Sequence, residues 1–221
     1  MFKRIDNVLS ANELATLKTI AKSAPFVSGR ISNPHNTLKN NLQLHDPEVG
    51  QQAAQIMLQA LGRNEEFNNY AFPKVIAPPI IASYKVGMHY GLHGDAAFLP
   101  ISSRRLRSDL SCTIFLNDLD VYDGGALRIN LSGTEFSTRL PPGSLMLYPS
   151  TTLHEVTPVT RGVRLVGITF IESRIADPEH REWLYELNEV AALEGLRMSR
   201  ENYTRLQRIQ QNLLREWGDP S

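Results

Sequence analysis

The chain has 221 residues, of which 42% are hydrophobic, and its 23 basic side chains balance its 23 acidic ones. This length fits one medium-sized domain, with or without an appendage. The charge balance disfavours a nucleic-acid partner, because nucleic-acid binders usually carry a basic excess. No apolar run approaches the roughly 20 residues of a membrane span, the first residues lack a signal-peptide core, and Cys112 has no second cysteine to pair with, so a cytoplasmic location without membrane contact is expected.

The first part of the chain predicts two helices separated by an irregular segment. A short strand is expected within Phe2–Val8, and Ser10–Glu13 then reads as a capping box that starts a helix with apolar residues at helical spacing. Residues 25–46 are polar and rich in turn formers, which indicates a loop or an irregular edge strand. A second helix is expected over Asp46–Gly62, because an N-cap carboxylate and a proline at the first helical position precede an apolar stripe.

From residue 74 onward the sequence predicts β-structure. The apolar segments become short, β-branched residues increase, and proline and glycine separate the segments. Seven or eight short strands without intervening helices favour an antiparallel sandwich or barrel. The expected strands are Lys74–Ala77, Ile80–Val86, Asp109–Asn117, Ala126–Leu131, Thr134–Leu140, Ser144–Tyr148, Leu153–Val156 and Val163–Glu172.

The last part of the chain returns to a helical pattern. Asp177 and Pro178 start one helix that Gly195 ends, and Ser199 starts another. Two helices joined by a short turn form a hairpin that is too small to bury a core of its own. It is therefore expected to dock on the β domain, residues 1–176, or on another subunit, so that residues 177–221 form an extension and a homo-oligomer through it is an open alternative.

A metal site is predicted at His93, Asp95 and His154. On an extended strand, residues two apart point to the same face, so the His93 imidazole and the Asp95 carboxylate are expected to lie together. His154 would then come from a strand across the barrel. Two histidines and one carboxylate on one side of a metal leave positions open for a chelating molecule and O₂, which suits Fe(II). Zinc is the rival metal, because the same ligands occur in catalytic zinc sites.

A second prediction concerns Arg164. Residues 157–163 read as a turn, so the chain would run out along His154–Val156 and return along Val163–Glu172. In such a hairpin Arg164 lies near His154 across the ladder. Its guanidinium would grip one carboxylate of a dicarboxylate through two hydrogen bonds, while the other end of that molecule binds the metal.

Four motifs in a fixed order carry a resemblance to a known family. They are Tyr84-x-x-Gly87-x-x-Tyr90-x-x-His93-x-Asp95, Asp123-Gly124-Gly125-Ala126-Leu127, Pro142-Gly143-Ser144-Leu145 and His154-x-x-x-Pro158-Val159-x-x-Gly162-x-Arg164. Together they resemble the prolyl-4-hydroxylase-like branch of the Fe(II)/2-oxoglutarate-dependent dioxygenases. Within that branch the chain looks most like the PKHD-type hydroxylases, and the match is strongest over residues 80–172.

The resemblance implies a mainly β fold with flanking helices: a double-stranded β-helix, or jelly roll, followed by the C-terminal helical hairpin. It implies one Fe(II) per subunit at His93, Asp95 and His154, and Arg164 as the partner of the distal carboxylate of 2-oxoglutarate. The implied reaction hydroxylates a C–H bond of a small-molecule or peptide substrate, consumes O₂ and releases succinate and CO₂. L-Ascorbate is the reductant that the resemblance suggests.

Two more cosubstrate contacts follow from the resemblance, and one is missing. Tyr84 is similar to a tyrosine that helps to hold 2-oxoglutarate in relatives, and Leu127 resembles an apolar wall of the same pocket. Phe115 stands where some prolyl hydroxylases carry a tyrosine that contacts the cosubstrate, and Phe has no hydroxyl to donate. Tyr84 or Ser111 is expected to compensate.

Beside the metal motif, the segment 96–108 is expected to be a loop that acts as a lid, with Arg104, Arg105 and Arg107 either attracting an anionic substrate or forming a solvated charge run. The asparagine-rich segment 32–45 is a second candidate rim loop of the site. Two other functions stay open at this point. A sensor on the same fold would bind iron and 2-oxoglutarate without producing succinate, and a zinc hydrolase would use the same three ligands.

Overall fold

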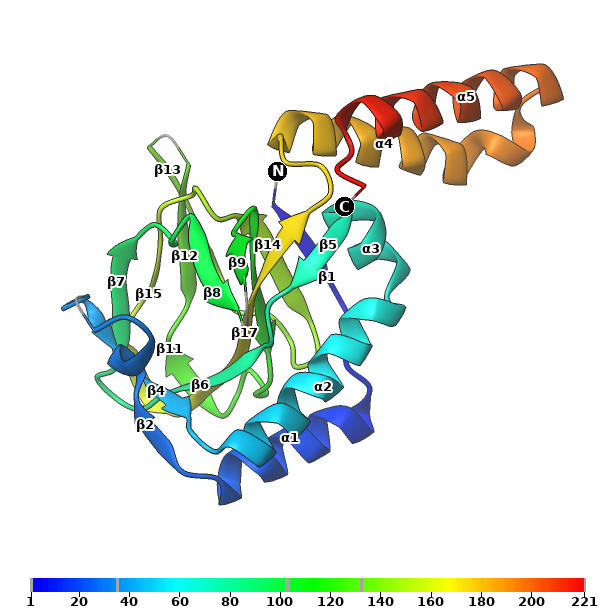
Figure 1. Cartoon of the computed structure of the whole chain (residues 1–221). Coiled ribbons are helices and arrows are strands. Elements are labelled where there is room, and N and C mark those ends of the chain that lie inside the picture. The colour runs from blue at the N-terminus through cyan, green and yellow to red at the C-terminus, as the bar shows by residue number, and fades with distance from the viewer. Residues whose placement is uncertain (1, 35, 102–103, 132, 221) are drawn as a thin grey trace.

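The computed structural model describes residues 2–34, 36–101, 104–131 and 133–220. Two antiparallel sheets face each other, helices cover the outside of the larger sheet, and a helical pair lies at one end (Figure 1). The eight strands predicted between residues 74 and 172 are all present, so the mainly β prediction is confirmed. No helix in the described part of the chain is long and apolar enough to cross a bilayer.

The larger sheet has eight strands, and its central strands position one half of the site. Around β17 (Arg164–Ser173), the longest strand, lie β10 (Leu110–Phe115) and β6 (Ile80–Tyr84), and β5 (Pro73–Ile76) pairs with its far end. The sheet continues outward through β14 (Leu145–Pro149) and β1 (Lys3–Ile5) on one side, and through β4 (Leu42–Leu44) and β2 (Phe26–Ser28) on the other.

The smaller sheet has five strands and carries the predicted metal ligands. Its order is β13 (Thr134–Thr138), β12 (Leu127–Leu131), β15 (His154–Val156), β7 (His89–His93) and β3 (Lys39–Asn40). Two separate strand pairs complete the β-structure: β8 (Phe98–Ile101) with β9 (Arg104–Arg107), and β11 (Tyr122–Gly124) with β16 (Val159–Gly162).

Three helices close the outer face of the larger sheet, α1 (Ala11–Ser23), α2 (Pro47–Arg63) and α3 (Glu65–Ala71) (Figure 1). On β10 the residues alternate: Cys112 and Ile114 join the core beneath the helices, while Phe115 joins a second core between the sheets. Because side chains on a strand alternate in direction, the residues left to face the interior between the sheets are those at odd positions of β10.

The helix starts are those that the sequence predicts. The Ser10 side chain accepts from the Glu13 amide and the Glu13 side chain accepts from the Ser10 amide, and the Asp46 carboxylate accepts from the Val49 amide. The short helix α3 was not predicted. It begins directly after α2 because the Asn64 side chain caps it by accepting from the Phe67 amide.

The C-terminal helices α4 (Pro178–Glu194) and α5 (Arg200–Trp217) form the predicted hairpin, and a 3₁₀ turn, Gly195–Arg197, joins them. Figure 1 shows the pair side by side at one end of the molecule, away from the two facing sheets. Helix α4 packs on the domain through Tyr185, whose ring meets Tyr70 of α3 edge-on and whose hydroxyl accepts from Lys3 Nζ at 2.6 Å.

The predicted hairpin between His154 and Arg164 is wrong. Strand β15 already has β12 and β7 as neighbours, and β17 has β10 and β6, so the two strands belong to different sheets. The segment between them is not a simple turn, because it contains β16. Gly162, at φ 70°, ends β16 so close to Val121 that a Cβ would lie 2.0 Å from the Val121 carbonyl oxygen; only glycine permits this approach.

Candidate metal centre

The three predicted ligands converge at the end of two neighbouring strands. His93 ends β7 and lies opposite His154 of β15 in the ladder, and Asp95 follows β7 directly. All ligand atoms lie within 4.8 Å of one another, and His154 Nε2 is 3.6 Å from Asp95 Oδ2. His154 therefore comes from the adjacent strand of the same sheet and not from across the barrel. His89, on the same strand as His93, is outside the cluster.

The backbone orients both imidazoles. Nδ1 of His93 lies 2.8 Å from the Gly91 carbonyl oxygen, and Nδ1 of His154 lies 3.0 Å from the Thr152 carbonyl oxygen. Because a carbonyl oxygen only accepts, each Nδ1 carries the proton and each Nε2 keeps its lone pair for the centre. Burial, together with the neighbouring His154, lowers the pKa of His93 to about 4, so its imidazole is neutral near pH 7.

A chain of buried hydroxyl groups holds the Asp95 carboxylate. Ser111 Oγ donates to Asp95 Oδ2 at 2.5 Å, so it accepts from Ser150 Oγ at 2.8 Å, which accepts in turn from Ser108 Oγ at 2.8 Å. All three serines are buried. Ser111 is one of the inward residues of β10, and the hydrogen bond fixes the carboxylate on the side facing the larger sheet. Ser111 is thus engaged with Asp95 and does not stand in for the missing hydroxyl at Phe115.

The ligands open into a cavity of about 670 Å³ between the two sheets. Arg164 reaches it from β17, where it lies opposite Tyr84 of β6. The Arg164 side chain is 1% exposed, and its Nε and Nη1 have no hydrogen-bond partner among the described residues; the same holds for the Tyr84 hydroxyl. Buried donors without partners are costly, so this end of the cavity is built to receive an acceptor.

A glycine and several apolar residues form the walls around Arg164. A Cβ on Gly125, at φ 58°, would lie 2.9 Å from Arg164 Cδ, so the absent side chain makes room for the arginine. Leu127 is buried and lines the cavity, where the sequence places it. The guanidinium carbon lies 4.9 Å from the centroid of the Tyr84 ring and 5.7 Å from that of Phe115, so two aromatic faces hold the cation.

The asparagine-rich segment 32–45, a candidate rim loop from the sequence, lines this cavity, but the sequence did not single out which of its side chains do so. Lys39, Asn41 and Gln43 are buried there, and both polar atoms of the Asn41 amide lack a hydrogen-bond partner among the described residues. Strands β3 and β4 have only two and three residues, and polar side chains occupy the buried positions 39, 41 and 43, so the hydrophobic pattern of the segment did not indicate these strands. The buried Lys39 in such a polar stretch had no distinguishing sequence signal.

The segment 96–108 is not a free loop, since it contains the pair β8 and β9. Arg104 donates to Glu172 at 2.6 Å, and Arg107 donates to Asp109 at 2.7 Å. Two of its three arginines are therefore neutralised by the domain itself. Phe98 and Leu99 of β8 line the cavity, so the pair forms an apolar part of its rim.

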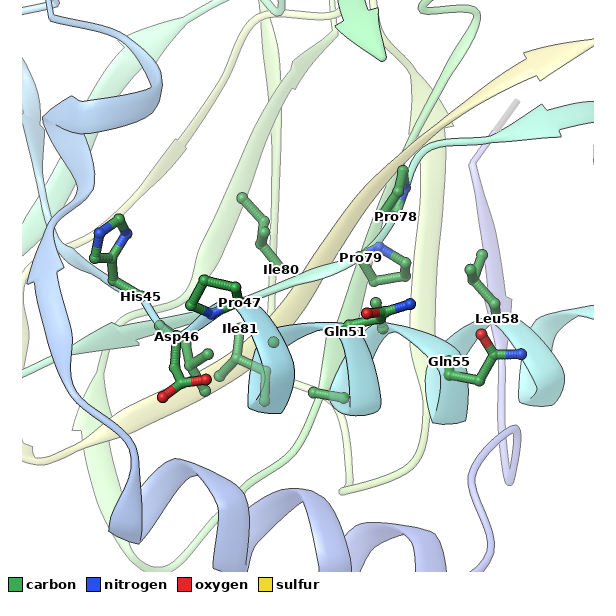
Figure 2. A pocket seen from close by; sticks show the side chains of 14 residues that line it. His45, Asp46, Pro47, Gln51, Gln55, Leu58, Pro78, Pro79, Ile80 and Ile81 are labelled. Atoms are coloured by element: carbon green, nitrogen blue, oxygen red, sulfur yellow. The ribbon is translucent and has the colours of Figure 1, made fainter. Parts of the chain in front are cut away.

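A second hollow of about 480 Å³ lies outside the barrel, between the first half of α2 and the Pro78-Pro79 turn (Figure 2). It shares Pro78 and Ile80 with the larger cavity. Its one carboxylate, Asp46, is used as the N-cap of α2, and the described residues place no group of metal-ligating side chains there. The group of metal-ligating side chains found among the described residues therefore lies in the cavity between the sheets.

Comparison with known proteins gives one consistent result. Residues 79–172 match the model of the 2OG-Fe(II) oxygenase superfamily. A PKHD-type hydroxylase of Sphingopyxis alaskensis is 52% identical over 217 residues, covering 98% of this chain and 99% of the relative, and one of Thermosynechococcus vestitus is 40% identical over 99% and 100%.

Solved structures agree on the fold. A Pseudomonas putida prolyl-4-hydroxylase has a TM-score of 0.57 at 22% identity, covering 77% of this chain and 92% of that one. A Trichoplax adhaerens prolyl hydroxylase, solved with a peptide fragment of a hypoxia-inducible factor, has a TM-score of 0.54 at 16% identity, covering 83% and 86%. These neighbours confirm the predicted jelly roll.

Proposed function

Because the chain belongs to the PKHD-type hydroxylases within the 2OG-Fe(II) oxygenase superfamily, we propose that His93, Asp95 and His154 hold its Fe(II) and that Arg164 binds 2-oxoglutarate. The protein is an iron- and 2-oxoglutarate-dependent oxygenase that hydroxylates a substrate. The observation that carries the site assignment is the convergence of the three ligand atoms within 4.8 Å at the wall of one cavity.

The residues present fit both groups. Two neutral imidazole nitrogens and one carboxylate are the donors of non-haem Fe(II) oxygenases. At the other end, the unpartnered Arg164 Nε and Nη1 and the Tyr84 hydroxyl are donors suited to a carboxylate. Asn41 lies in the same wall with both amide atoms unpartnered, so we assign it to the cosubstrate end as well. Leu127 supplies apolar surface between the ends.

Bound iron supplies O₂ activation coupled to the oxidative decarboxylation of 2-oxoglutarate to succinate and CO₂. The role of the chain's own residues is to bind and orient the metal and 2-oxoglutarate. His93, Asp95 and His154 would hold the metal at the cavity wall, and Arg164 would bind the distal carboxylate of 2-oxoglutarate at the other end of the cavity. The buried aromatic and aliphatic walls keep bulk water from the reacting groups.

The test is turnover of 2-oxoglutarate by the purified protein. With Fe(II), we expect slow succinate formation even without a primary substrate, and no activity with Zn(II) in its place. A protein that binds Fe(II) and 2-oxoglutarate yet forms no succinate with any substrate in a broad library would be a sensor. Hydrolytic activity restored by Zn(II) alone would indicate a hydrolase.

Ser111→Ala is expected to weaken metal binding by about tenfold to a hundredfold, because groups that orient a metal ligand contribute on that scale. The Asp95 carboxylate would lose its only side-chain hydrogen bond to the serine chain. Titration of the apoprotein with Co(II), followed by its visible absorption, measures the affinity. Ser111→Thr, which keeps the hydroxyl, should retain most of it, whereas unchanged affinity in Ser111→Ala would exclude the positioning role.

Several finer assignments are part of this proposal. Sequence reasoning supports a cytoplasmic protein and L-ascorbate as the reductant, and the exposed apolar residues Leu193 and Leu196 on the C-terminal hairpin support a homo-oligomer. We also propose residues 1–176 as the oxygenase domain and 177–221 as its extension. A peptide is one candidate substrate, since the Trichoplax adhaerens neighbour binds one, and a small molecule is the other.

A further inference from the structure

Lys39 is a buried cation in the wall of the site cavity. It lies in β3, opposite Tyr90 of β7, and its side chain lines the cavity with 9% of the residue exposed. Among the described residues, no carboxylate lies within salt-bridge distance of its ammonium group, which instead donates to Ser32 Oγ at 2.7 Å. A buried, unpaired ammonium is unfavourable unless a ligand compensates it.

The ammonium group stands beside the metal centre. Lys39 Nζ is 5.5 Å from the centroid of the Tyr90 ring, and the His93 ring stacks on the same tyrosine at 3.6 Å between centroids. The cation and a proposed metal ligand therefore share one aromatic neighbour. Burial lowers the pKa of Lys39, and the Asp95 carboxylate opposes this, as expected for a charge held in the cavity without a partner of its own.

The hydrogen-bonding capacity around Lys39 is not used up. Ser32 Oγ accepts from Lys39 and from Gln43 Nε2 and donates to the Gly29 carbonyl, so the serine is fully engaged. An ammonium group has three donors, and only one of those of Lys39 has a hydrogen-bond partner among the described residues. Two donors remain for a ligand in the cavity.

With Fe(II) and 2-oxoglutarate bound, the charges of the site would balance without the charge of Lys39. Fe(II) and Arg164 bring three positive charges, and Asp95 together with doubly charged 2-oxoglutarate brings three negative ones, while the metal-bound histidines are neutral. The remaining single charge in the cavity wall is that of Lys39. The arginines of the β8–β9 pair do not take this role, because Arg104 and Arg107 are paired with Glu172 and Asp109.

We propose that Lys39 binds a carboxylate group of the primary substrate, so that the enzyme hydroxylates a carboxylate-bearing small molecule or peptide. A carboxylate supplies the single negative charge that the site lacks and two acceptor oxygens for the two free donors. A phosphate group, with nearly two charges, would leave the site negative. This inference rests on the proposed function, since it assigns the substrate class of the same site.

The test compares binding of matched ligand pairs. N-Acetyl amino acids and the corresponding N-acetyl amino acid amides differ only in the carboxylate, and calorimetry on the Zn(II)-loaded protein with 2-oxoglutarate measures both without turnover. For the pairs that bind, we expect wild type to prefer the carboxylate by about tenfold to a hundredfold. Lys39→Met should reduce this ratio to near one, Lys39→Arg should keep part of it, and Lys22→Met, at an exposed lysine of α1, should keep it all.

Each other result overturns the proposal. A wild-type protein that favours no carboxylate in any pair excludes a carboxylate subsite, and an unchanged ratio in Lys39→Met excludes this lysine. If Lys39→Met weakens 2-oxoglutarate binding but leaves the ratio intact, Lys39 belongs to the cosubstrate end instead. Circular dichroism shows whether the variant is folded. Absence of Fe(II)-dependent succinate formation in wild type would overturn the proposed function, and the binding ratio would still be measurable.

Discussion

Replacing His154 with alanine is expected to lower Fe(II)-dependent succinate formation by more than about a hundredfold, since even residues that only orient a metal ligand contribute up to that much. His154 is buried in the middle of the smaller sheet, between β12 and β7, and its Nε2 faces Asp95. Apart from His93, which already belongs to the cluster, no histidine among the described residues lies there to replace it. Chromatographic detection of succinate, together with the iron content after desalting, measures the effect.

His89→Ala is the matched control for this variant. His89 lies on the same strand as His93, but its ring nitrogen Nδ1 only approaches the Gly87 carbonyl, at 3.3 Å. Its replacement should leave iron content and succinate formation close to those of wild type. Wild-type iron content in His154→Ala would show that the metal lies elsewhere, and so would equal losses in the two variants.

Arg164→Met is expected to raise the KM for 2-oxoglutarate on the order of a hundredfold, because a buried, charge-assisted pair of hydrogen bonds to the distal carboxylate is lost. The maximal rate should change much less, since the metal ligands are untouched. Arg164→Lys keeps the charge but not the two-pronged geometry, so its KM should lie between those of wild type and Arg164→Met. Initial rates of succinate formation at varied 2-oxoglutarate concentration measure all three.

Arg161→Met separates this effect from a general loss of positive charge. Arg161 is three residues away, on β16, and pairs with Asp123 at the surface. The KM of Arg161→Met for 2-oxoglutarate should match that of wild type. A KM in Arg164→Met that stays within twofold of wild type would remove Arg164 from the cosubstrate site, and an equal rise in Arg161→Met would point to long-range electrostatics.

The sequence predicted the site best where local geometry decides it. His93 ends β7 and Asp95 follows it two residues later, so their closeness in the sequence already keeps the two side chains near each other, and the Ser111 hydrogen bond fixes the Asp95 carboxylate. The helix starts at Ser10 and Asp46 follow equally from local capping chemistry. Pairing between distant strands was harder to predict from the sequence. The predicted hairpin between His154 and Arg164 is wrong because each of the two strands pairs with other neighbours, and only the complete sheets show this.

The residues that were missed have a common physical origin. Lys39 and Asn41 belong to a segment with very short strands, and the buried positions there carry polar side chains, so the hydrophobic pattern does not mark them as buried. Ser111 was considered for the cosubstrate, but its partner Asp95 became visible only once β10 stood opposite the end of β7. Polar groups in a shared cavity are brought together by tertiary structure, and a linear pattern does not encode their distances.

The separation of the two sheets has a consequence for cosubstrate choice. The proposed metal ligands belong to the smaller sheet and Arg164 to the larger one, and facing sheets in proteins pack at about 10 Å. A cosubstrate held at both ends must therefore match the distance between the sheets, less the reach of the side chains that bind it. A keto-diacid one carbon shorter or longer than 2-oxoglutarate is expected to bind more weakly, because the two ends of the site are fixed on different sheets.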